Sequence, residues 1–208
     1  MEKKIIYTIG REFASGGKSI AKKLSEKLGI PYYDKELLAR AARSSGIAEE
    51  IFKLQDEKPT NSFLYSLVMD TYSFGGYHAG ASFLEMPLNQ RVFLAQFDAI
   101  KKIAAEGSCI IVGRCADYAL AEEENCINTF IYADKSYRIK RISKELELDE
   151  NKAKDLINRM DKERASYYNF YTSKKWGDSR SYDICLNSEK LGIDGCVEML
   201  LAYTNIVL

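Results

Sequence analysis

Residues 9–19 read Ile9-Gly10-Arg11-Glu12-Phe13-Ala14-Ser15-Gly16-Gly17-Lys18-Ser19. This stretch follows a short β-rich run, residues 4–9, and precedes a run in which apolar residues recur at helical spacing as far as Gly29. Strand, glycine turn and helix in that order are typical of a phosphate-binding loop. Glycines let the backbone amides approach an anion closely, and the helix N-terminus adds a favourable dipole. The stretch therefore predicts a loop that binds phosphate groups.

The residue types in the loop indicate how the work is divided. Residues 15–17 would enclose the phosphates of ATP, Lys18 would bind the β- and γ-phosphates, and Ser19 would offer its hydroxyl to the accompanying Mg²⁺. The pattern is close to G-x-x-x-x-G-K-[ST] but departs from it at the first glycine, where Glu12 stands. The alternative is an ordinary turn between a strand and a helix, whose glycines only satisfy backbone geometry.

The rest of the chain alternates short apolar runs with helical patterns. This alternation predicts an α/β fold with a parallel five-stranded sheet between two layers of helices, the three-layer α/β/α arrangement of P-loop NTPases. The expected strands are residues 4–9, 30–34, 109–112, 127–132 and 182–186, and the expected helices are 18–28, 36–44, 47–55, 62–72, 88–105, 135–147, 149–162 and 192–203.

The distribution of expected strands along the chain indicates how the domain is organised. We expect one P-loop domain over residues 1–208, because no linker rich in Ser or Pro divides it. Residues 35–106 contain no good strand pattern after the second strand and are expected to form a helical insert that serves as a substrate lobe. The lone His78 lies there, in a loop of glycines and aromatics, and is interpreted as a surface residue.

Composition excludes several classes of protein. The 208 residues contain 30 Lys and Arg against 30 Asp and Glu, so the net charge is zero and argues against a nucleic-acid-binding protein. No apolar run approaches the roughly 18 residues of a membrane helix. The five cysteines are odd in number and none forms a C-x-x-C pair, which favours buried thiols over disulfides or zinc. A cytoplasmic location is expected.

Several segments together resemble the cytidylate kinase-like proteins, a bacterial branch of the P-loop nucleoside monophosphate kinases. The similarity lies in residues 4–34, 110–117, 130–141 and 158–164, which match in order and spacing. It implies a kinase that uses ATP and Mg²⁺ and acts on a small nucleotide. It also implies that residues 149–180 form a lid that closes over the phosphates.

The resemblance assigns four residues to the phosphate acceptor. Asp34, after the second strand, and Arg40, on the following helix, match positions that meet the nucleoside monophosphate. Arg114, after the third strand, would grip its phosphate, and Asp117 would orient Arg114 or contact the base. Three of them have a plainer interpretation: a helix cap for Asp34, a solvated helix face for Arg40 and a structural ion pair for Arg114.

Charged residues of the expected lid and of the helix before it form a second group. Arg138 and Arg141 are spaced i, i+3 on one helix, which places both guanidinium groups on a common face to bind ATP phosphates. By resemblance, Asp161 and Arg164 match the Asp-x-x-Arg of the lid. With Lys18 and Arg114 they would be the catalytic residues of phosphoryl transfer. Each charge taken alone is equally consistent with a solvated helix face.

Two lid arginines typical of cytidylate kinases are missing, since Ile157 and Met160 stand near their positions. Three functions therefore remain open. The first is phosphoryl transfer from ATP to a nucleoside monophosphate such as CMP, and the second is transfer to another small acceptor, such as a sugar or a shikimate-like alcohol. The third is a nucleotide-binding regulatory protein that has lost catalysis. The aromatic residues in 165–178 favour a packed lid or a homodimer contact.

Overall fold

The computed structural model describes residues 4–57 and 86–207. The expected helix at 62–72 and His78 with its loop lie outside these residues. The elements, in chain order, are β1 Ile6–Arg11, α1 Gly17–Leu28, β2 Tyr32–Tyr33, α2 Glu36–Ser45, α3 Glu49–Gln55, α6 Leu88–Glu106, β3 Cys109–Val112, α7 Ala116–Ala119, β4 Cys126–Tyr132, α8 Lys135–Leu146, α9 Glu150–Thr172, the 3₁₀ turn η1 Ser179–Ser181, β5 Ile184–Asn187 and α10 Ser188–Val207.

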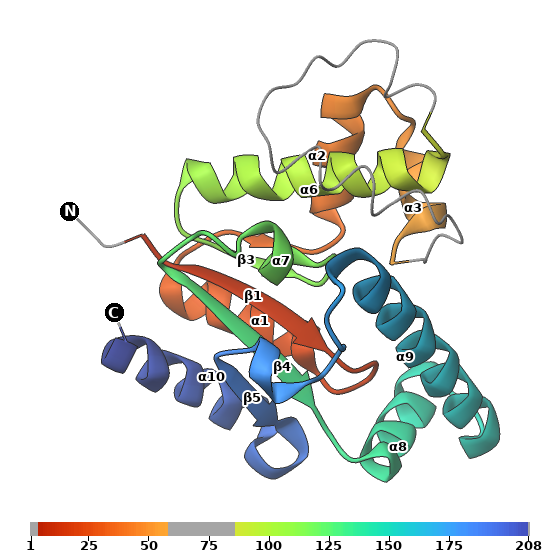
Figure 1. The fold of residues 1–208 in the computed structure, drawn as a ribbon. Helices are drawn as coiled ribbons and strands as arrows, with labels where there is room; N and C mark the ends of the chain where they lie inside the picture. The colour runs from red at the N-terminus through yellow and green to blue at the C-terminus, as the bar shows by residue number, and fades with distance from the viewer. Residues whose placement is uncertain (1–3, 58–85, 208) are drawn as a thin grey trace.

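The described strands form one five-stranded sheet of order β2-β3-β1-β4-β5 (Figure 1). Every neighbouring pair is parallel, with β1 in the centre and paired to β3 and β4. The predicted parallel α/β sheet is therefore confirmed. Parallel strands direct their carboxyl ends to a common edge, so the loops after β1, β2 and β3 meet there.

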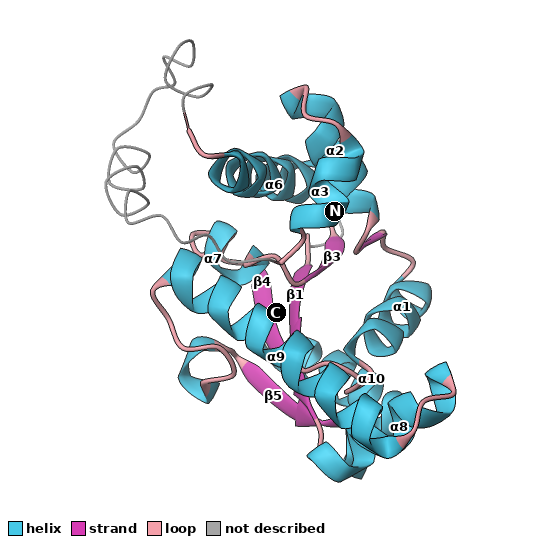
Figure 2. Cartoon of the chain, turned by 90° about the vertical axis from the view of Figure 1, so that its right-hand side faces the viewer, coloured by secondary structure: helices cyan, strands magenta, loops and turns pink. Residues whose placement is uncertain are grey.

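Helices cover both faces of the sheet, which gives the three expected layers (Figure 2). Ile6 and Ile111 belong to a core shared with α2, α3, α6 and α7. Tyr7 and Ile9, which point the opposite way, belong to a second core shared with α1 and α10. Side chains alternate between the faces along each strand. Both faces are buried, so the strands read as continuous apolar runs.

The structure differs from the expected elements mainly at their ends. Helix α9 continues to Thr172, well beyond the expected 162, because its aromatic residues pack on α6 and are not a loop. Tyr171 stacks on Phe93 with ring centroids 3.8 Å apart. Helix α10 begins at Ser188 rather than 192 and contains a non-helical Gly192. The short α7 and η1 were not expected. None of the described helices is long and apolar enough to cross a membrane.

We expect Leu24→Ala to test how firmly α1, which starts at the phosphate loop, is packed. Leu24 is fully buried between α1 and the sheet, so the substitution should lower the free energy of unfolding by about 2–5 kcal/mol. Leu54, on α3, is 64% exposed, and Leu54→Ala should change it by less than about 0.5 kcal/mol. Urea denaturation of both variants measures the difference, and equal losses would contradict this description of the core.

Candidate functional site

The loop between β1 and α1 turns through two left-handed residues, Ala14 (φ 62°) and Gly16 (φ 88°). Ser15, between them, is fully buried, and both its amide and its hydroxyl donate to the carbonyl of Glu12. Ser15 therefore holds the loop closed from inside. It does not line the cleft described below.

The start of α1 is free to accept an anion. Its N-cap makes no side-chain hydrogen bond and its first turn contains no acidic residue. Among the described residues, none of the backbone amides of residues 16–19 has an assigned acceptor. Orphan amides at a helix N-terminus are the donors that bind phosphate.

Gly16 has a further constraint. A Cβ at this position would come within 2.6 Å of Nη1 of Arg141, so the guanidinium of α8 lies directly against the loop. Orphan amides, Lys18, Ser19 and the Arg141 guanidinium together fit the phosphates of a nucleotide accompanied by Mg²⁺. These residues would therefore hold a nucleotide by its phosphates, together with Mg²⁺.

Glu12 stands where the loop pattern has a glycine, and its carboxylate binds groups outside the loop. Its Oε2 accepts the amide of Ala133, 3.0 Å away, and lies 3.3 Å from Nε of Arg138. Burial raises the pKa of Glu12, although the Ala133 amide and Arg138 partly offset that effect. The carboxylate thus joins the loop to the segment between β4 and α8, and the loop closes without a glycine at this position.

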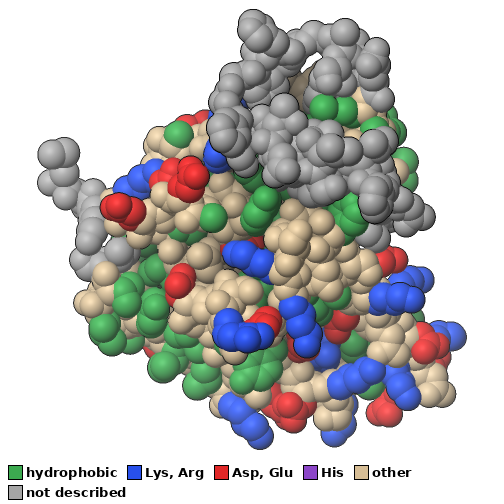
Figure 3. Space-filling view, viewed as in Figure 1, with side chains coloured by type: hydrophobic (Ala, Val, Ile, Leu, Met, Phe, Trp, Pro, Cys, Tyr) green, Lys and Arg blue, Asp and Glu red, His purple; other side chains and the backbone are tan. Residues whose placement is uncertain are grey.

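The loop opens into a cleft of about 600 Å³ at the carboxyl edge of the sheet. Its charged lining comes from several elements and includes Arg11, Lys18, Asp34, Glu57, Arg114 and Arg164. Figure 3 shows further Lys and Arg side chains on the surface over α8 and α9. The cleft is where the ends of β1, β2 and β3 meet the amino-terminal end of α1.

A chain of ion pairs runs from the phosphate loop to α3. Nζ of Lys18 lies 2.9 Å from Oδ2 of Asp34, and Oδ1 of Asp34 lies 3.2 Å from Nη1 of Arg114. The Arg114 guanidinium also makes two bonds of 2.8 and 2.9 Å to the carboxylate of Asp56. Burial alone would raise the pKa of Asp34, but Arg114, Lys18 and Arg11 together hold it below its ordinary value. Asp34 is therefore ionised at neutral pH.

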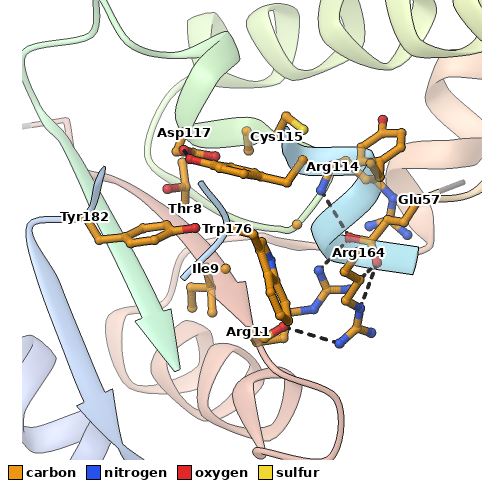
Figure 4. A pocket seen from close by; sticks show the side chains of 15 residues that line it. Thr8, Ile9, Arg11, Glu57, Arg114, Cys115, Asp117, Arg164, Trp176 and Tyr182 are labelled. Carbon is orange, nitrogen blue, oxygen red and sulfur yellow. Dashed lines mark hydrogen bonds and ion pairs between the residues drawn. The ribbon is translucent and has the colours of Figure 1, made fainter. Parts of the chain in front are cut away.

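A second cluster centres on Glu57 (Figure 4). Its carboxylate binds Nη1 and Nη2 of Arg11 at 2.6 and 3.2 Å and Nε of Arg164 at 3.0 Å, and it accepts the Arg114 amide at 3.3 Å. Burial would raise the pKa of Glu57, yet the three arginines lower it well below its ordinary value. Gly113 leaves room for the cluster, because a Cβ there would clash with the Arg11–Glu57 pair.

Besides Ser15, four residues expected at the site do not line the cleft: Arg40, Asp117, Arg138 and Asp161. Arg40 lies on the surface of α2 and pairs with Glu106. Asp117 is buried on α7 and accepts the Tyr168 hydroxyl at 2.6 Å. It lines a small cavity beside β1, which shares Arg11, Glu57, Arg114 and Arg164 with the cleft and whose lining residues Figure 4 shows.

Arg138 and Asp161 form a buried brace behind the loop. Arg138 donates to Asp161 at 2.6 Å and to the carbonyl of Phe13 at 3.1 Å, and Asp161 accepts the Phe13 amide at 2.7 Å. These two residues thus position the loop from α8 and α9. Arg141 lies on the same helix as Arg138 but lines the cleft. Arg138 therefore supports the loop, while Arg141 is available to a ligand.

Sequence reasoning missed Arg11, Asp56 and Glu57. A charged residue at the carboxyl end of the first strand is a signal for Arg11, since that position faces the carboxyl edge of the sheet. The acidic pair Asp56–Glu57 follows α3 and gives no local signal, because its partners lie far away in the sequence. Of the two positions where lid arginines are missing, Ile157 is buried between α8 and α9, and Met160 lines the cleft.

Acid should remove the stabilisation that Glu57 provides. The folded protein lowers the pKa of Glu57 below 4.5, so its contribution is complete above that pH and is lost as pH falls further. At pH 7 we expect Glu57→Gln to lower the free energy of unfolding by about 3 kcal/mol. The difference from wild type should shrink towards pH 3 in chemical denaturation.

The matched control is Glu49→Gln, which removes a carboxylate from an exposed pair with Lys53. We expect the control to change stability by less than about 0.5 kcal/mol at any pH. A stability difference for Glu57→Gln that is the same at pH 7 and pH 3 would contradict the assigned ionisation.

Comparisons with known proteins agree with this geometry. A solved structure of an uncharacterized protein from Eubacterium ventriosum ATCC 27560 is 34% identical with a TM-score of 0.70, over 97% of this chain and 98% of that chain. Shikimate kinase from Bacteroides thetaiotaomicron shares the fold, with 12% identity and a TM-score of 0.56 over 98% and 99% of the two chains. No curated protein matches this sequence.

A family model, that of the cytidylate kinase-like family, matches residues 6–190. The matched range includes the phosphate loop, the charged cleft and the brace behind the loop. It also contains every strand of the sheet. The chain therefore belongs to the cytidylate kinase-like family and has the fold of the P-loop kinases.

Proposed function

We propose that the protein transfers the γ-phosphoryl group of Mg²⁺·ATP to a nucleoside monophosphate, with CMP as the first candidate. The observation that carries this proposal is that one cleft joins the orphan amides of the loop to Arg114 and Arg164. A donor site and an anion site for the acceptor thus share the same space. Family membership supports a kinase reaction.

The residues of the cleft suit phosphoryl transfer. The amides of residues 16–19 and Lys18 would hold and neutralise the donor phosphates, and Ser19 would meet Mg²⁺. Arg141, against Gly16, and Arg164 would balance the charge that spreads over the transferred group. Such transfer depends on positioning and electrostatic stabilisation. A phosphate acceptor already carries its nucleophilic oxygen ionised, so it needs no general base.

We also propose that residues 149–180 act as a lid and residues 35–106 as a substrate lobe. Arg164 reaches the cleft from α9, within the first segment, and Glu57 reaches it from the second. An ion pair between them links the two segments across the cleft. We further propose that the protein works in the cytoplasm, where its five cysteines remain thiols.

A hydroxyl-bearing acceptor is the second candidate. Asp34 favours it, because this ionised carboxylate lies beside Lys18 at the end of β2 and faces the cleft. A carboxylate there could accept the proton of an alcohol as it attacks. The Asp34 carboxylate is, however, already paired with both Lys18 and Arg114, which makes it a weak base. We therefore place the monophosphate first.

An acceptor screen with Asp34→Asn separates the two candidates. Release of ADP from Mg²⁺·ATP would be measured with nucleoside monophosphates, sugars and shikimate as acceptors. We expect turnover with a nucleoside monophosphate, and a fall on Asp34→Asn smaller than the 10²- to 10⁴-fold that loss of a general base causes. Turnover with an alcohol and a fall in that range would support the second candidate. ATP binding without transfer to any acceptor would contradict both and favour a regulatory protein.

Lys18→Ala should abolish measurable transfer while the fold remains. Loss of a cation that neutralises the transferred group is expected to reduce kcat by at least about 10²-fold. Lys18 is 62% exposed, so the circular dichroism spectrum should not change. The matched control is Lys23→Ala, also on α1, whose partner is the exposed Asp194. Unchanged turnover in Lys18→Ala would refute the assignment of this lysine.

A further inference from the structure

The Glu57 carboxylate has the surroundings of a bound oxyanion. Four donors converge on it: both Nη atoms of Arg11, Nε of Arg164 and the backbone amide of Arg114. They come from the end of β1, from α9 and from the turn after β3. Arginine forks and backbone amides together are the donors that proteins use to bind phosphate groups.

The arginines need an anion between them. Burial and the neighbouring Arg11 guanidinium lower the pKa of Arg164, and the Glu57 carboxylate opposes that shift. Like charges repel strongly in a partly buried site, so an anion must remain wherever these two guanidinium groups meet. Any group that replaced Glu57 would therefore have to be negatively charged.

Glu57 is held in an unfavourable backbone conformation. Its φ of 53° lies in the left-handed region, which a residue with a Cβ adopts at a cost in free energy. The ion pairs to Arg11 and Arg164 offset that cost. When Glu57 leaves its site, the free-energy cost of this backbone conformation is relieved. Such relief of strain is found in segments that switch between two states.

The site opens into the same cleft as the phosphate loop. Arg11, Glu57 and Arg164 line that cleft together with Gly17 and Lys18. An anion that entered from the cleft would thus reach Arg11 and Arg164 without crossing the core. A phosphate monoester carries more charge than a carboxylate and offers three acceptor oxygens.

We propose that Glu57 is a built-in occupant of an anion site formed by Arg11, Arg164 and the Arg114 amide, and that the anionic group of the acceptor enters by displacing it. The proposed function is needed only to identify that group as the acceptor's phosphate. No bond is formed or broken in the exchange. The cost of removing Glu57 weakens the apparent affinity for the anion, so an acceptor with a dianionic group is favoured over a neutral one.

The test uses inorganic phosphate as the probe and needs no turnover. Calorimetric titration of phosphate would compare wild type with Glu57→Gln, each also carrying Lys18→Ala to weaken binding at the loop. We expect Glu57→Gln to tighten phosphate binding by at least about tenfold, both with Lys18 present and with Lys18→Ala. The control Glu49→Gln, on α3, removes one negative charge just as Glu57→Gln does, and it should leave the phosphate affinity unchanged.

A second readout covers loss of stability in the variant. Phosphate should raise the Tm of Glu57→Gln more than that of wild type, because it would replace the missing charge between the arginines. Glu57→Asp, which keeps the charge on a shorter side chain, should lie between the two. Equal phosphate affinity and an equal shift in Tm for wild type and Glu57→Gln would overturn the proposal. If that result came with normal transfer from ATP, the proposed function would stand without it. If Glu57→Gln changed the response to phosphate but the protein bound no ATP, the anion site would be supported and the proposed kinase function would be refuted.

Discussion

The organising constraint of this molecule is the repulsion among cations gathered at the carboxyl edge of its sheet. Arg11, Lys18, Arg114 and Arg164 line one cleft, and such like charges cannot be held close together in a partly buried site without counter-ions. Asp34, Asp56 and Glu57 supply them. The cleft is thus almost neutral while it keeps the donors that phosphate groups need.

The fold explains why these cations meet. In a parallel sheet the carboxyl ends of β1, β2 and β3 lie at one edge, and each is followed by a turn that carries a charged residue. Arg11 ends β1, Asp34 follows β2 and Arg114 follows β3. The amino-terminal end of α1 adds its dipole at the same edge. Helices α8 and α9 then bring Arg141 and Arg164 over the opening.

The sheet and the phosphate loop could be predicted because their signals are local. The run 109–112 is apolar throughout and became β3, and the glycines before Lys18 marked the start of α1. The acceptor side was predicted less well. Resemblance placed Arg40 at the acceptor and spacing placed Arg138 at the ATP phosphates, but their partners Glu106 and Asp161 lie in other elements of the fold. Pairing across the fold decides whether an arginine faces a ligand or a carboxylate, and one sequence does not contain that information.

Charged and uncharged acceptors differ in what they demand of Glu57. A neutral alcohol cannot replace its carboxylate, so Arg11 and Arg164 would remain paired to it during transfer and would contribute little to the acceptor. A phosphate monoester can take its place, because it brings the negative charge that the two guanidinium groups require. The exchange would also release the left-handed backbone of Glu57. The strain at this residue, and the convergence of four donors on its carboxylate, are features that an anionic acceptor would use and a neutral one would not. This asymmetry favours a nucleoside monophosphate over an uncharged alcohol such as a sugar, whereas a carboxylate-bearing alcohol such as shikimate would share the advantage.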